Sequence, residues 1–372
     1  MTAKALLATD ENAFRCALLD WYRASKRDLP WRRTRNPYAI WVSEIMLQQT
    51  QVKTTIPYFE KFLARFPSVK DLAEAPEEEV LKMWQGLGYY RRARHLQAAA
   101  RQIESDHGGE FPKSKSGIDG LKGVGSYTSA AIASIAFEQP YACVDGNVIR
   151  VITRLAAIDG DVSQSATLRA IELIAQALLD PESPGDHNQA MMELGATVCT
   201  PKNPCCLVCP VAQFCQTKQC GGDPHTRPLK TRKTKVSKQK VESGFFFLKG
   251  KFLIAKRRGD GLMGDLWELP GITQDLEKSW PQYLANEIEL VWERPKPYRH
   301  KFTHLHVTYV ISAWSLDKQA IWQQSPEGYS AFKMVTPPEL DDIPLTHVCQ
   351  SVLPELIPFL EPATHAKSDT ET

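Results

Sequence analysis

The sequence predicts a multi-domain protein in which an all-α part precedes an α+β part. Three features lead to this prediction: helical spacing of apolar residues in the first part, a basic stretch after it, and apolar–polar alternation in the second part. With 372 residues, 43% of them hydrophobic, the chain is long enough for two or three domains. We therefore place a helical domain at 1–220, a linker at 221–240, a second domain at 241–361 and a disordered tail at 362–372.

Helical periodicity dominates the first domain. Apolar residues form two stripes at helical spacing, the first of Phe14, Leu18, Trp21 and Tyr22 and the second of Ile56, Phe59, Leu63 and Phe66. A further helix is expected after Ala75, because Pro76 suits a first turn and three glutamates follow at the positive end of the helix dipole. Segments 126–137 and 147–157 predict two more helices.

The stretch 221–240 differs in composition from both domains. It contains seven Lys or Arg residues against one acid, Asp223, together with two prolines and two glycines. Such a linker is either solvated or lies along an anionic partner, and the sequence favours neither. Beyond it, two apolar runs on either side of 249–251 predict a β-hairpin, and alternation over 305–313 predicts a further strand.

Four of the nine cysteines, Cys199, Cys206, Cys209 and Cys215, form the pattern C-x6-C-x2-C-x5-C within 17 residues, 199–215. Four thiolates in this cysteine loop would repel one another unless a cation or cluster neutralised them. Zinc sites usually combine two close cysteine pairs. A single close pair flanked by single cysteines instead favours one [4Fe-4S] cluster, with zinc as the alternative. Cys205 could replace Cys206 as a ligand.

Cysteine usage and charge bound the class of protein. Clustered cysteines indicate reduced thiols, so we expect a cytoplasmic protein. No apolar run approaches the roughly 18 residues that a membrane span needs, so no membrane partner is expected. The formal net charge of +2 neither indicates nor excludes a nucleic-acid partner, which must be argued from local charge.

Two short motifs stand at predicted helix starts. Leu121-Lys-Gly-Val-Gly125 precedes the helix 126–137, and its glycines would let a phosphate approach the helix N-terminus. An ordinary interhelical turn has the same appearance. Val144-Asp-Gly-Asn-Val148 follows, where Asp145 or Asn147 could serve simply as an N-cap. The succession of glycine hairpin, Asp-Gly-Asn turn and cysteine loop, each at a helix boundary, favours a functional role.

These motifs together resemble the endonuclease III superfamily of base-excision DNA glycosylases, whose helix-hairpin-helix domain carries an iron–sulfur loop. Within that superfamily, segments 30–52, 84–94 and 188–200 are very similar to MutY-type adenine DNA glycosylases. The resemblance begins near Asp20 and covers most of the chain. It implies a monomeric bacterial, nucleoid-associated enzyme that extrudes and hydrolytically removes adenine mispaired with 8-oxoguanine or guanine in double-stranded DNA.

The resemblance implies two catalytic carboxylates, and the chemistry needs two with different duties. Glu44, among apolar neighbours on a predicted helix, should have a raised pKa and protonate N7 of the leaving adenine. Asp145, near the positive end of a predicted helix, should stay ionised and stabilise the oxocarbenium-like sugar or bond to it transiently. Asn147 and Tyr127 match family active-site positions and would orient Asp145 and the sugar.

Tyr127 also distinguishes two reactions. Bifunctional members of the superfamily carry a lysine there, whose amine forms a Schiff base before the strand is cut. Some family members have a lysine at the position of Ile149. The resemblance therefore implies hydrolysis without lyase activity. The alternatives are a bifunctional glycosylase and lyase, and a non-catalytic iron–sulfur protein that binds DNA or transfers electrons.

Other residues match family positions that contact DNA. Gln49 and Tyr89 would probe the duplex beside the extruded base, although a surface Gln and a core Tyr need no such role. The adenine pocket is expected to include Arg27, Trp31, Arg32 and Gln189. The DNA backbone would lie against Gly123, Val124 and Gly125.

The second domain resembles the opening of the Nudix fold over Gly264–Gly271. Nudix hydrolases bind magnesium through a downstream REUxEE helix, whereas the following residues offer only Glu277, Glu287 and Glu289 without that motif. A pyrophosphohydrolase is therefore a minor alternative. The resemblance instead implies a Nudix-like domain that recognises 8-oxoguanine through Phe302, Thr303 and His304, where Thr303 replaces the family's serine and keeps its hydroxyl.

Overall fold

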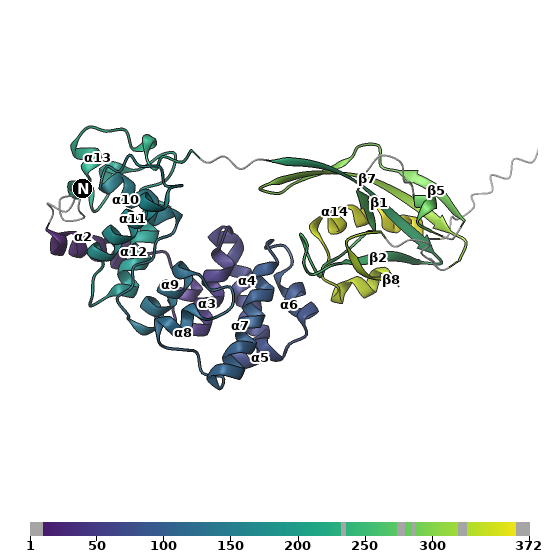
Figure 1. The fold of residues 1–372 in the computed structure, drawn as a ribbon, viewed down its shortest axis with the longest axis horizontal. Helices are drawn as coiled ribbons and strands as arrows, with labels where there is room; N and C mark the ends of the chain where they lie inside the picture. The colour runs from purple at the N-terminus through teal and green to yellow at the C-terminus, as the bar shows by residue number, and fades with distance from the viewer. Residues whose placement is uncertain (1–9, 232–235, 274–279, 285–286, 319–325, 362–372) are drawn as a thin grey trace, which may run out of the picture. The chain divides into compact units, whose positions relative to one another are not determined.

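The computed structural model describes residues 10–231, 236–273, 280–284, 287–318 and 326–361. The chain divides into two compact units, drawn in Figure 1. The helical unit comprises Met1–Glu74 and His95–Lys233, and the sheet unit comprises Ala75–Arg94 and Thr234–Thr372. The tail that we predict to be disordered, 362–372, and Glu277 lie outside the described residues.

Helices build the helical unit. They are α2 (Glu11–Ser25), η1 (Pro30–Arg32), α3 (Pro37–Leu47), α4 (Val52–Arg65), α5 (Val69–Glu74), α7 (Arg91–His107, which begins in the sheet unit), α8 (Lys115–Asp119), α9 (Ser126–Phe137), α10 (Gly146–Leu155), α11 (Ser165–Leu178) and α12 (Pro184–Thr197). Short turns follow in and after the cysteine loop: η2 (Cys206–Val208), η3 (Ala212–Phe214), α13 (Gln216–Gln219) and η4 (Pro224–Thr226). No helix within the described ranges is long and apolar enough to cross a membrane.

Local sequence explains where the site-bearing helices begin. At α3, the Asn36 side chain accepts a hydrogen bond from the Tyr38 N–H at 2.9 Å, and Pro37 fills the first position. At α10, Asp145 is the N-cap, as its sequence context allowed. Helix α12 packs against α2, α9 and α10, and α3 packs against α9. These contacts bring four helices, α3, α9, α10 and α12, next to one another (Figure 1).

An apolar core joins α2, α10, α11 and α12. Phe14, Leu18 and Tyr22, three members of the first predicted stripe, are buried in it with Val148 and Leu194. Three cysteines of the loop, Cys199, Cys209 and Cys215, pack against the same core. The cysteine loop is therefore packed against α10, which begins at the Asp-Gly-Asn turn, and α12, which ends at Thr197.

A mixed sheet forms most of the sheet unit. Its strands are β1 (Ser237–Leu248), β2 (Lys251–Arg257), β3 (Trp267–Glu268), β4 (Gly271–Thr273), β5 (Ile288–Glu293), β6 (Tyr298–Lys301), β7 (Leu305–Leu316) and β8 (Tyr329–Val335). The central order is β3-β2-β1-β7-β5, while β4 pairs with β1, β6 with β7 and β8 with β2. Helices η5 (Trp280–Gln282), η6 (Pro337–Asp342), α14 (His347–Leu356) and η7 (Ile357–Leu360) lie between or after the strands.

The predicted hairpin is present and tighter than expected. Phe247 pairs with Phe252 and Leu248 with Lys251, so only Lys249 and Gly250 form the turn. Both have positive φ, 47° and 77°, the conformation that two-residue hairpin turns require. Strand β7 then pairs with β1 in parallel, which puts a predicted alternating segment at the centre of the sheet.

Apolar side chains cover both faces of this sheet. Phe245 and Ile254 lie in a core with Val348 and Leu353 of α14. Phe246, the next residue of β1, packs with Trp280 in a second apolar cluster, where the two ring centroids lie 4.9 Å apart. Because successive strand residues point to opposite faces, the apolar run 245–247 serves two cores at once.

Segment 75–94, with the helix α6 (Glu77–Trp84), groups with the sheet unit rather than with the predicted first domain. Glu78 pairs with Lys256 at 2.8 Å, and Arg94 pairs with Asp265 at 2.5 Å. The Lys82 ammonium donates to two backbone carbonyls, those of Leu340 and Ile343, at 3.2 Å each. Charged side chains thus tie this segment to the sheet, although its local pattern is that of an ordinary helix.

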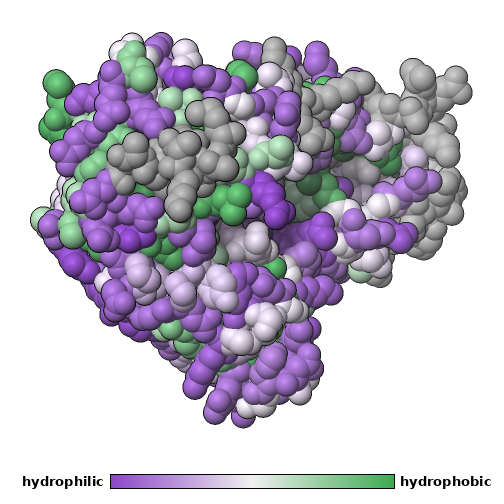
Figure 2. Space-filling model, turned by 60° about the vertical axis from the view of Figure 1, so that its left-hand side comes forward, coloured by the Kyte–Doolittle hydropathy of each residue, from purple (hydrophilic) through white to green (hydrophobic). Residues whose placement is uncertain are grey.

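The stretch that we predict as a linker has structure at both ends. Leu229 bridges to Asp161, and Arg227 pairs with Asp159 at 2.6 Å, so its first part lies on the helical unit. Strand β1 begins at Ser237, inside the predicted linker range. On the face drawn in Figure 2, hydrophobic residues appear as small separate groups among hydrophilic ones.

Candidate active site

A cavity of about 560 Å³ is lined by residues of α3, α12 and the first turns of α9 and α10. Nine of the residues predicted for the site line it: Arg27, Trp31, Arg32, Glu44, Gln49, Tyr127, Asp145, Asn147 and Gln189. Residues far apart in the sequence are thus brought to one place, and both predicted catalytic carboxylates are among them.

Glu44 is a buried carboxyl in the wall of this cavity. It lies on α3, is 5% exposed, and its Oε2 accepts a hydrogen bond of 2.7 Å from the Tyr127 hydroxyl. Burial raises the pKa of Glu44 from 4.5 to about 7; the Tyr127 hydrogen bond opposes this rise and the charge of Asp145 adds to it. The predicted direction of the shift is confirmed. A carboxyl with this pKa can both give and take a proton near neutral pH.

Tyr127 stands between Glu44 and α12. Its hydroxyl donates to Glu44 and lies 3.2 Å from the Met192 sulfur. Burial raises the pKa of Tyr127 well above 10, and the nearby Glu44 carboxylate adds to the rise, so the phenol remains a neutral donor. The family resemblance implies that Tyr127 orients Asp145 and the sugar; its hydrogen bond in the structure is to Glu44 instead.

Asp145 caps helix α10 and faces the same cavity. Its Oδ1 accepts from the Val148 N–H at 2.8 Å, and its Oδ2 accepts from the Asn147 side-chain amide at 2.8 Å. Burial raises the pKa of Asp145, while these hydrogen bonds lower it. The upward shift was not expected from the sequence, because the positive end of a helix favours the anion but the extent of burial is a tertiary property.

Asn188, a residue that the sequence analysis did not single out, holds the chain just before Asp145. Its Oδ1 accepts from the Cys143 N–H at 2.9 Å, and its Nδ2 donates to the Tyr141 carbonyl at 2.8 Å and the Ser134 hydroxyl at 2.9 Å. Asn188 is 2% exposed, so its side-chain amide is paired away from solvent. The approach to the Asp-Gly-Asn turn is therefore fixed by α12.

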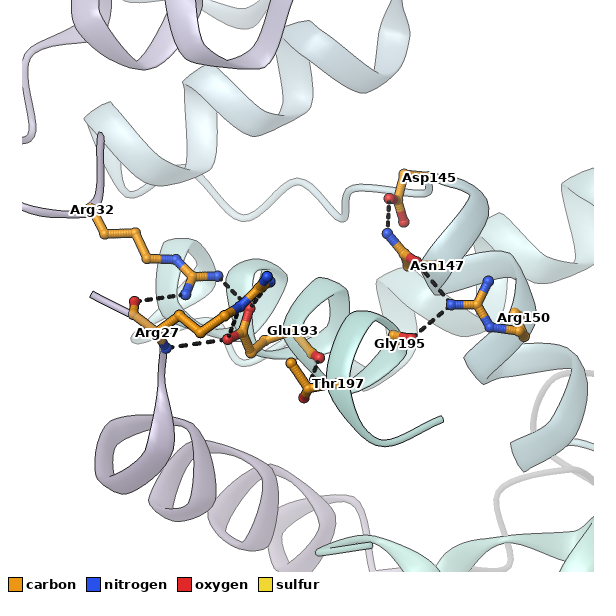
Figure 3. Close-up of polar contacts among 8 residues, drawn as sticks. All are labelled: Arg27, Arg32, Asp145, Asn147, Arg150, Glu193, Gly195 and Thr197. Atoms are coloured by element: carbon orange, nitrogen blue, oxygen red, sulfur yellow. Dashed lines mark hydrogen bonds and ion pairs between the residues drawn. The ribbon is translucent and has the colours of Figure 1, made fainter. Parts of the chain in front are cut away.

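Glu193 is a second residue that the sequence analysis missed. Its side chain is 1% exposed, lines the cavity, and forms ion pairs with both arginines of the predicted adenine pocket (Figure 3). Arg27 Nη2 lies 2.6 Å and Arg32 Nη2 lies 2.9 Å from Glu193 Oε2. Burial opposes ionisation, but hydrogen bonds from the two arginines outweigh it and lower the pKa of Glu193 to about 2. Glu193 is thus a fixed anion that orients both arginines.

Arg150 links the Asp-Gly-Asn turn to the cysteine loop. Its Nη2 donates to the Asn147 side-chain carbonyl at 2.8 Å and to the Gly195 carbonyl at 2.7 Å, as Figure 3 shows. Its Nε donates to the Cys199 carbonyl at 2.8 Å. Asn147 in turn donates to Asp145, so one arginine connects the first cysteine of the loop with the catalytic candidate.

Gln49 and Tyr89 differ in position. Gln49 follows α3 at the cavity rim, exposed and with φ of 59°. Tyr89 belongs to the sheet unit and is 50% exposed, so it is not a buried core residue. There its hydroxyl lies 2.7 Å from that of Thr303. Both residues adopt the left-handed conformation that most side chains avoid, which is commonly found at functional sites.

The predicted 8-oxoguanine loop is the tight connection between β6 and β7. The Phe302 N–H donates to the Leu305 carbonyl at 2.7 Å, and the Ser237 N–H holds the His304 carbonyl at 3.0 Å. Phe302 packs against the sheet core, whereas Thr303 and His304 are exposed. The connection therefore exposes two polar side chains, while Phe302 attaches it to the sheet core.

The glycine hairpin leaves the start of α9 open. Gly123 has φ of 77°, and a Cβ there would lie 2.5 Å from the His95 side chain, so this position requires glycine. Gly125 is the N-cap of α9 and supplies no side chain to its amides, and nothing lies within 4 Å of its Cβ position. The first-turn N–H groups can thus receive an anion.

A second cavity, of about 310 Å³, lies at the cysteine loop. Its lining includes the four predicted ligands, Cys205 and the apolar residues Val151, Leu155, Leu194, Val198 and Val211. Burial raises the pKa of Cys209 to about 11, and the neighbouring thiols add to this, so its thiolate requires a bound cation. Across the described ranges, no three His, Cys, Asp or Glu side chains are grouped as a site for a single metal ion. The four thiols that line this mostly apolar cavity are the donor set that a four-thiolate iron–sulfur cluster uses.

Comparison with known proteins identifies the class. Residues 42–176 match the model of the HhH-GPD superfamily base excision DNA repair proteins, and residues 245–355 match that of the NUDIX domain. The solved structure of a thermostable thymine-DNA glycosylase aligns with a TM-score of 0.51 at 30% identity, over 56% of this chain and 96% of that one. The fold and the site therefore define a helix-hairpin-helix base-excision DNA glycosylase followed by a Nudix-like domain.

Curated relatives narrow this class. The chain is 37% identical to the human adenine DNA glycosylase, over 85% of this chain and 69% of the relative. It is 32% identical to the adenine DNA glycosylase of Buchnera aphidicola subsp. Schizaphis graminum, over 79% of this chain and 86% of the relative. The chain belongs to the adenine DNA glycosylase family, a DNA-binding enzyme of base excision repair that removes adenine. The resemblance stated from the sequence is confirmed.

Proposed function

We propose that this enzyme hydrolytically removes adenine mispaired with 8-oxoguanine or guanine in double-stranded DNA, and that it acts without lyase activity. One observation carries this proposal: Glu44 and Asp145 line a single cavity in different environments. Glu44 accepts its hydrogen bond from the neutral Tyr127 hydroxyl, whereas Asp145 accepts two N–H groups. Pairs of carboxyl groups whose environments differ in this way divide acid and anion roles between them.

Glu44 and Asp145 have different roles in breaking the bond between the adenine and the sugar. Protonated Glu44 gives its proton to N7 of the extruded adenine as the bond between the sugar C1′ and the base breaks, and adenine leaves neutral. Anionic Asp145 stabilises the positive charge that develops on the sugar. Water then adds to C1′ and its proton returns to Glu44, which restores the starting state. Asn147 and the α10 amides hold Asp145 in place for this step.

Base recognition is assigned to the arginine pair and Gln189. Glu193 fixes Arg27 and Arg32 at the cavity wall, where their remaining N–H groups and Gln189 can hydrogen-bond an extruded purine. Trp31, 7% exposed, supplies an aromatic surface to the same cavity. Gln49 would contact the duplex at the rim, and the backbone at Gly123, Val124 and Gly125 would bind a DNA phosphate.

The assignment as a hydrolase rests on the residue at position 127. Tyr127 occupies the place of the lysine of bifunctional enzymes, and no lysine is among the described residues that line the cavity. With a duplex bearing adenine opposite 8-oxoguanine, we expect full release of free adenine, strand breaks only after alkali, and no DNA adduct trapped by borohydride. A bifunctional glycosylase run in parallel serves as the positive control. A trapped adduct with this chain would contradict the hydrolytic mechanism.

The pKa of Glu44 predicts the pH dependence of catalysis. Since the acid form is active and its pKa is about 7, the single-turnover rate constant should be level below pH 7. Above it, the rate should fall about tenfold per pH unit as Glu44 ionises. Measurements between pH 5.5 and about 9 with saturating enzyme test this. A rate that rises with pH over this range would exclude Glu44 as the proton donor.

The Tyr89–Thr303 contact supports a role for the β6–β7 connection in reading the base opposite adenine. We expect Thr303→Val, which removes the hydroxyl at nearly constant shape, to lower the preference for 8-oxoguanine over guanine about fivefold, the value of one hydrogen bond. Thr303→Ser keeps the hydroxyl and should retain the preference. The ratio of excision rates on the two duplexes measures it, and equal ratios for all three proteins would show that another residue reads the base.

The cysteine loop is assigned one [4Fe-4S] cluster. Cys199, Cys206, Cys209 and Cys215 would hold it, with Cys205 as the alternative to Cys206, since all five line the cavity. When bound, the cluster would cross-link the loop and supply no group to the hydrolysis. We further propose that the enzyme acts as a monomer in the bacterial cytoplasm, on the DNA of the nucleoid.

A further inference from the structure

Arg154 is a buried arginine of α10 that the reaction does not use. It is 3% exposed, and its guanidinium reaches three successive residues of the cysteine loop. Nη1 donates to the Thr200 carbonyl at 2.8 Å and to the Cys199 carbonyl at 3.3 Å, and Nη2 donates to the Pro201 carbonyl at 3.3 Å. Nη1 also lies 3.3 Å from the Cys199 sulfur.

The same side chain reaches beyond the loop. Its Nε donates to the carbonyls of Pro224 at 2.8 Å and Arg227 at 3.1 Å, two residues that follow Cys215, the last predicted ligand. Its own carbonyl accepts the Thr217 hydroxyl at 2.5 Å. Arg154 therefore connects three places: the start of the cysteine loop at Cys199, the turn after Cys215, and the segment 224–227 that follows the loop.

The charge of Arg154 has no acidic partner within the described parts of the chain. All its acceptors there are carbonyls and one sulfur, and no carboxylate lies within ion-pair distance. Arg150, the nearest arginine along the helix, adds a second positive charge and contacts Cys199 as well. A buried cation without a counter-charge is costly, so an anion is required beside it.

The cavity next to Arg154 supplies the place for that anion. Arg154 and the four predicted ligands line it together. Four thiolates outweigh the positive charge of an iron–sulfur core, so the bound assembly would be an anion in contact with the guanidinium.

We propose that Arg154 is the positioning residue of the cluster site: its charge balances the bound cluster, and its N–H groups hold Cys199 and both flanks of the loop in the loaded arrangement. This inference rests on the proposed [4Fe-4S] assignment. Because a donor to a ligating sulfur and a nearby positive charge both favour the reduced state, Arg154 also raises the reduction potential of the cluster.

The test compares the full-length wild-type protein with Arg154→Lys and Arg154→Gln. Arg169→Gln, which removes an exposed arginine of α11, is the matched control. Iron and acid-labile sulfide per chain, the rate of iron loss to a chelator and the reduction potential are measured without DNA. We expect iron loss about tenfold faster in Arg154→Lys and about 10- to 100-fold faster in Arg154→Gln, as for other residues that support metal ligands.

The potential separates charge from hydrogen bonding. It should stay near the wild-type value in Arg154→Lys, which keeps the charge, and become more negative in Arg154→Gln, while Arg169→Gln matches the wild type in every measurement. If Arg154→Gln yields no folded protein, the iron-loss rate of Arg154→Lys decides. Wild-type iron retention in either Arg154 variant would overturn the inference. A wild-type protein without iron and sulfide would instead overturn the cluster assignment itself.

Discussion

Replacing Glu44 by Gln should abolish adenine release while DNA binding persists. The change removes the acidic proton that we assign to the leaving base and keeps the size of the side chain, its burial and an acceptor for the Tyr127 hydroxyl. General acid catalysis contributes about 10²- to 10⁴-fold. We expect the single-turnover rate constant to fall by at least that range, measured on a duplex with adenine opposite 8-oxoguanine.

Two controls accompany the Glu44→Gln variant: a binding measurement and the variant Tyr127→Phe. The affinity for the same duplex, measured in parallel, should change little, because the amide still fits the cavity wall. Tyr127→Phe removes the hydrogen bond to Glu44 but not the acid, so it should reduce the rate far less. Wild-type excision by Glu44→Gln would eliminate Glu44 as the acid, and loss of binding together with excision would point to a folding defect.

Replacing Asp145 by Asn should lower the rate about 10²- to 10³-fold, the usual effect of removing one electrostatic contact to a transition state. Asparagine is as good an N-cap as aspartate, so it can keep the hydrogen bond from the Val148 N–H and the start of α10. The variant therefore removes the negative charge with little loss of structure.

A companion variant distinguishes charge from capping. Asp145→Ala removes both and should lower the free energy of unfolding by about 1 kcal/mol, the typical cost of losing an N-cap. Thermal unfolding of the two variants, read beside their excision rates, separates the effects. If Asp145→Asn excises at the wild-type rate while Asp145→Ala is inactive, Asp145 would be a structural cap and the proposed role of its charge would be wrong.

Much of the fold followed from local patterns. The helix at 126–137 is present with the predicted bounds, because small residues and the preceding glycines define it locally. The hairpin at Lys249 and Gly250 followed from apolar runs on either side of a turn. The grouping of segment 75–94 with the sheet could not be predicted, since it depends on side chains such as Lys256 and Asp265 that are distant in sequence.

The candidate site shows the same division. Glu44 and Asp145 were found through the family resemblance, and apolar neighbours gave the direction of the Glu44 pKa shift. Glu193 was missed because its partners Arg27 and Arg32 lie 166 and 161 positions away, and a lone glutamate on a helix gives no local signal. Arg150 was missed for a related reason: its role depends on the carbonyls of Gly195 and Cys199, and carbonyls carry no sequence signature.

A structure of this protein bound to a duplex that carries a non-hydrolysable deoxyadenosine analogue opposite 8-oxoguanine would test the shared role of Glu44 and Asp145 most directly. We predict that the extruded nucleotide occupies the cavity between α3 and α10, with a Glu44 oxygen within about 2.6–3.2 Å of the base N7 and Asp145 beside C1′ of the same nucleotide. An extruded base held elsewhere, or the two carboxylates contacting different nucleotides, would contradict the shared role of Glu44 and Asp145.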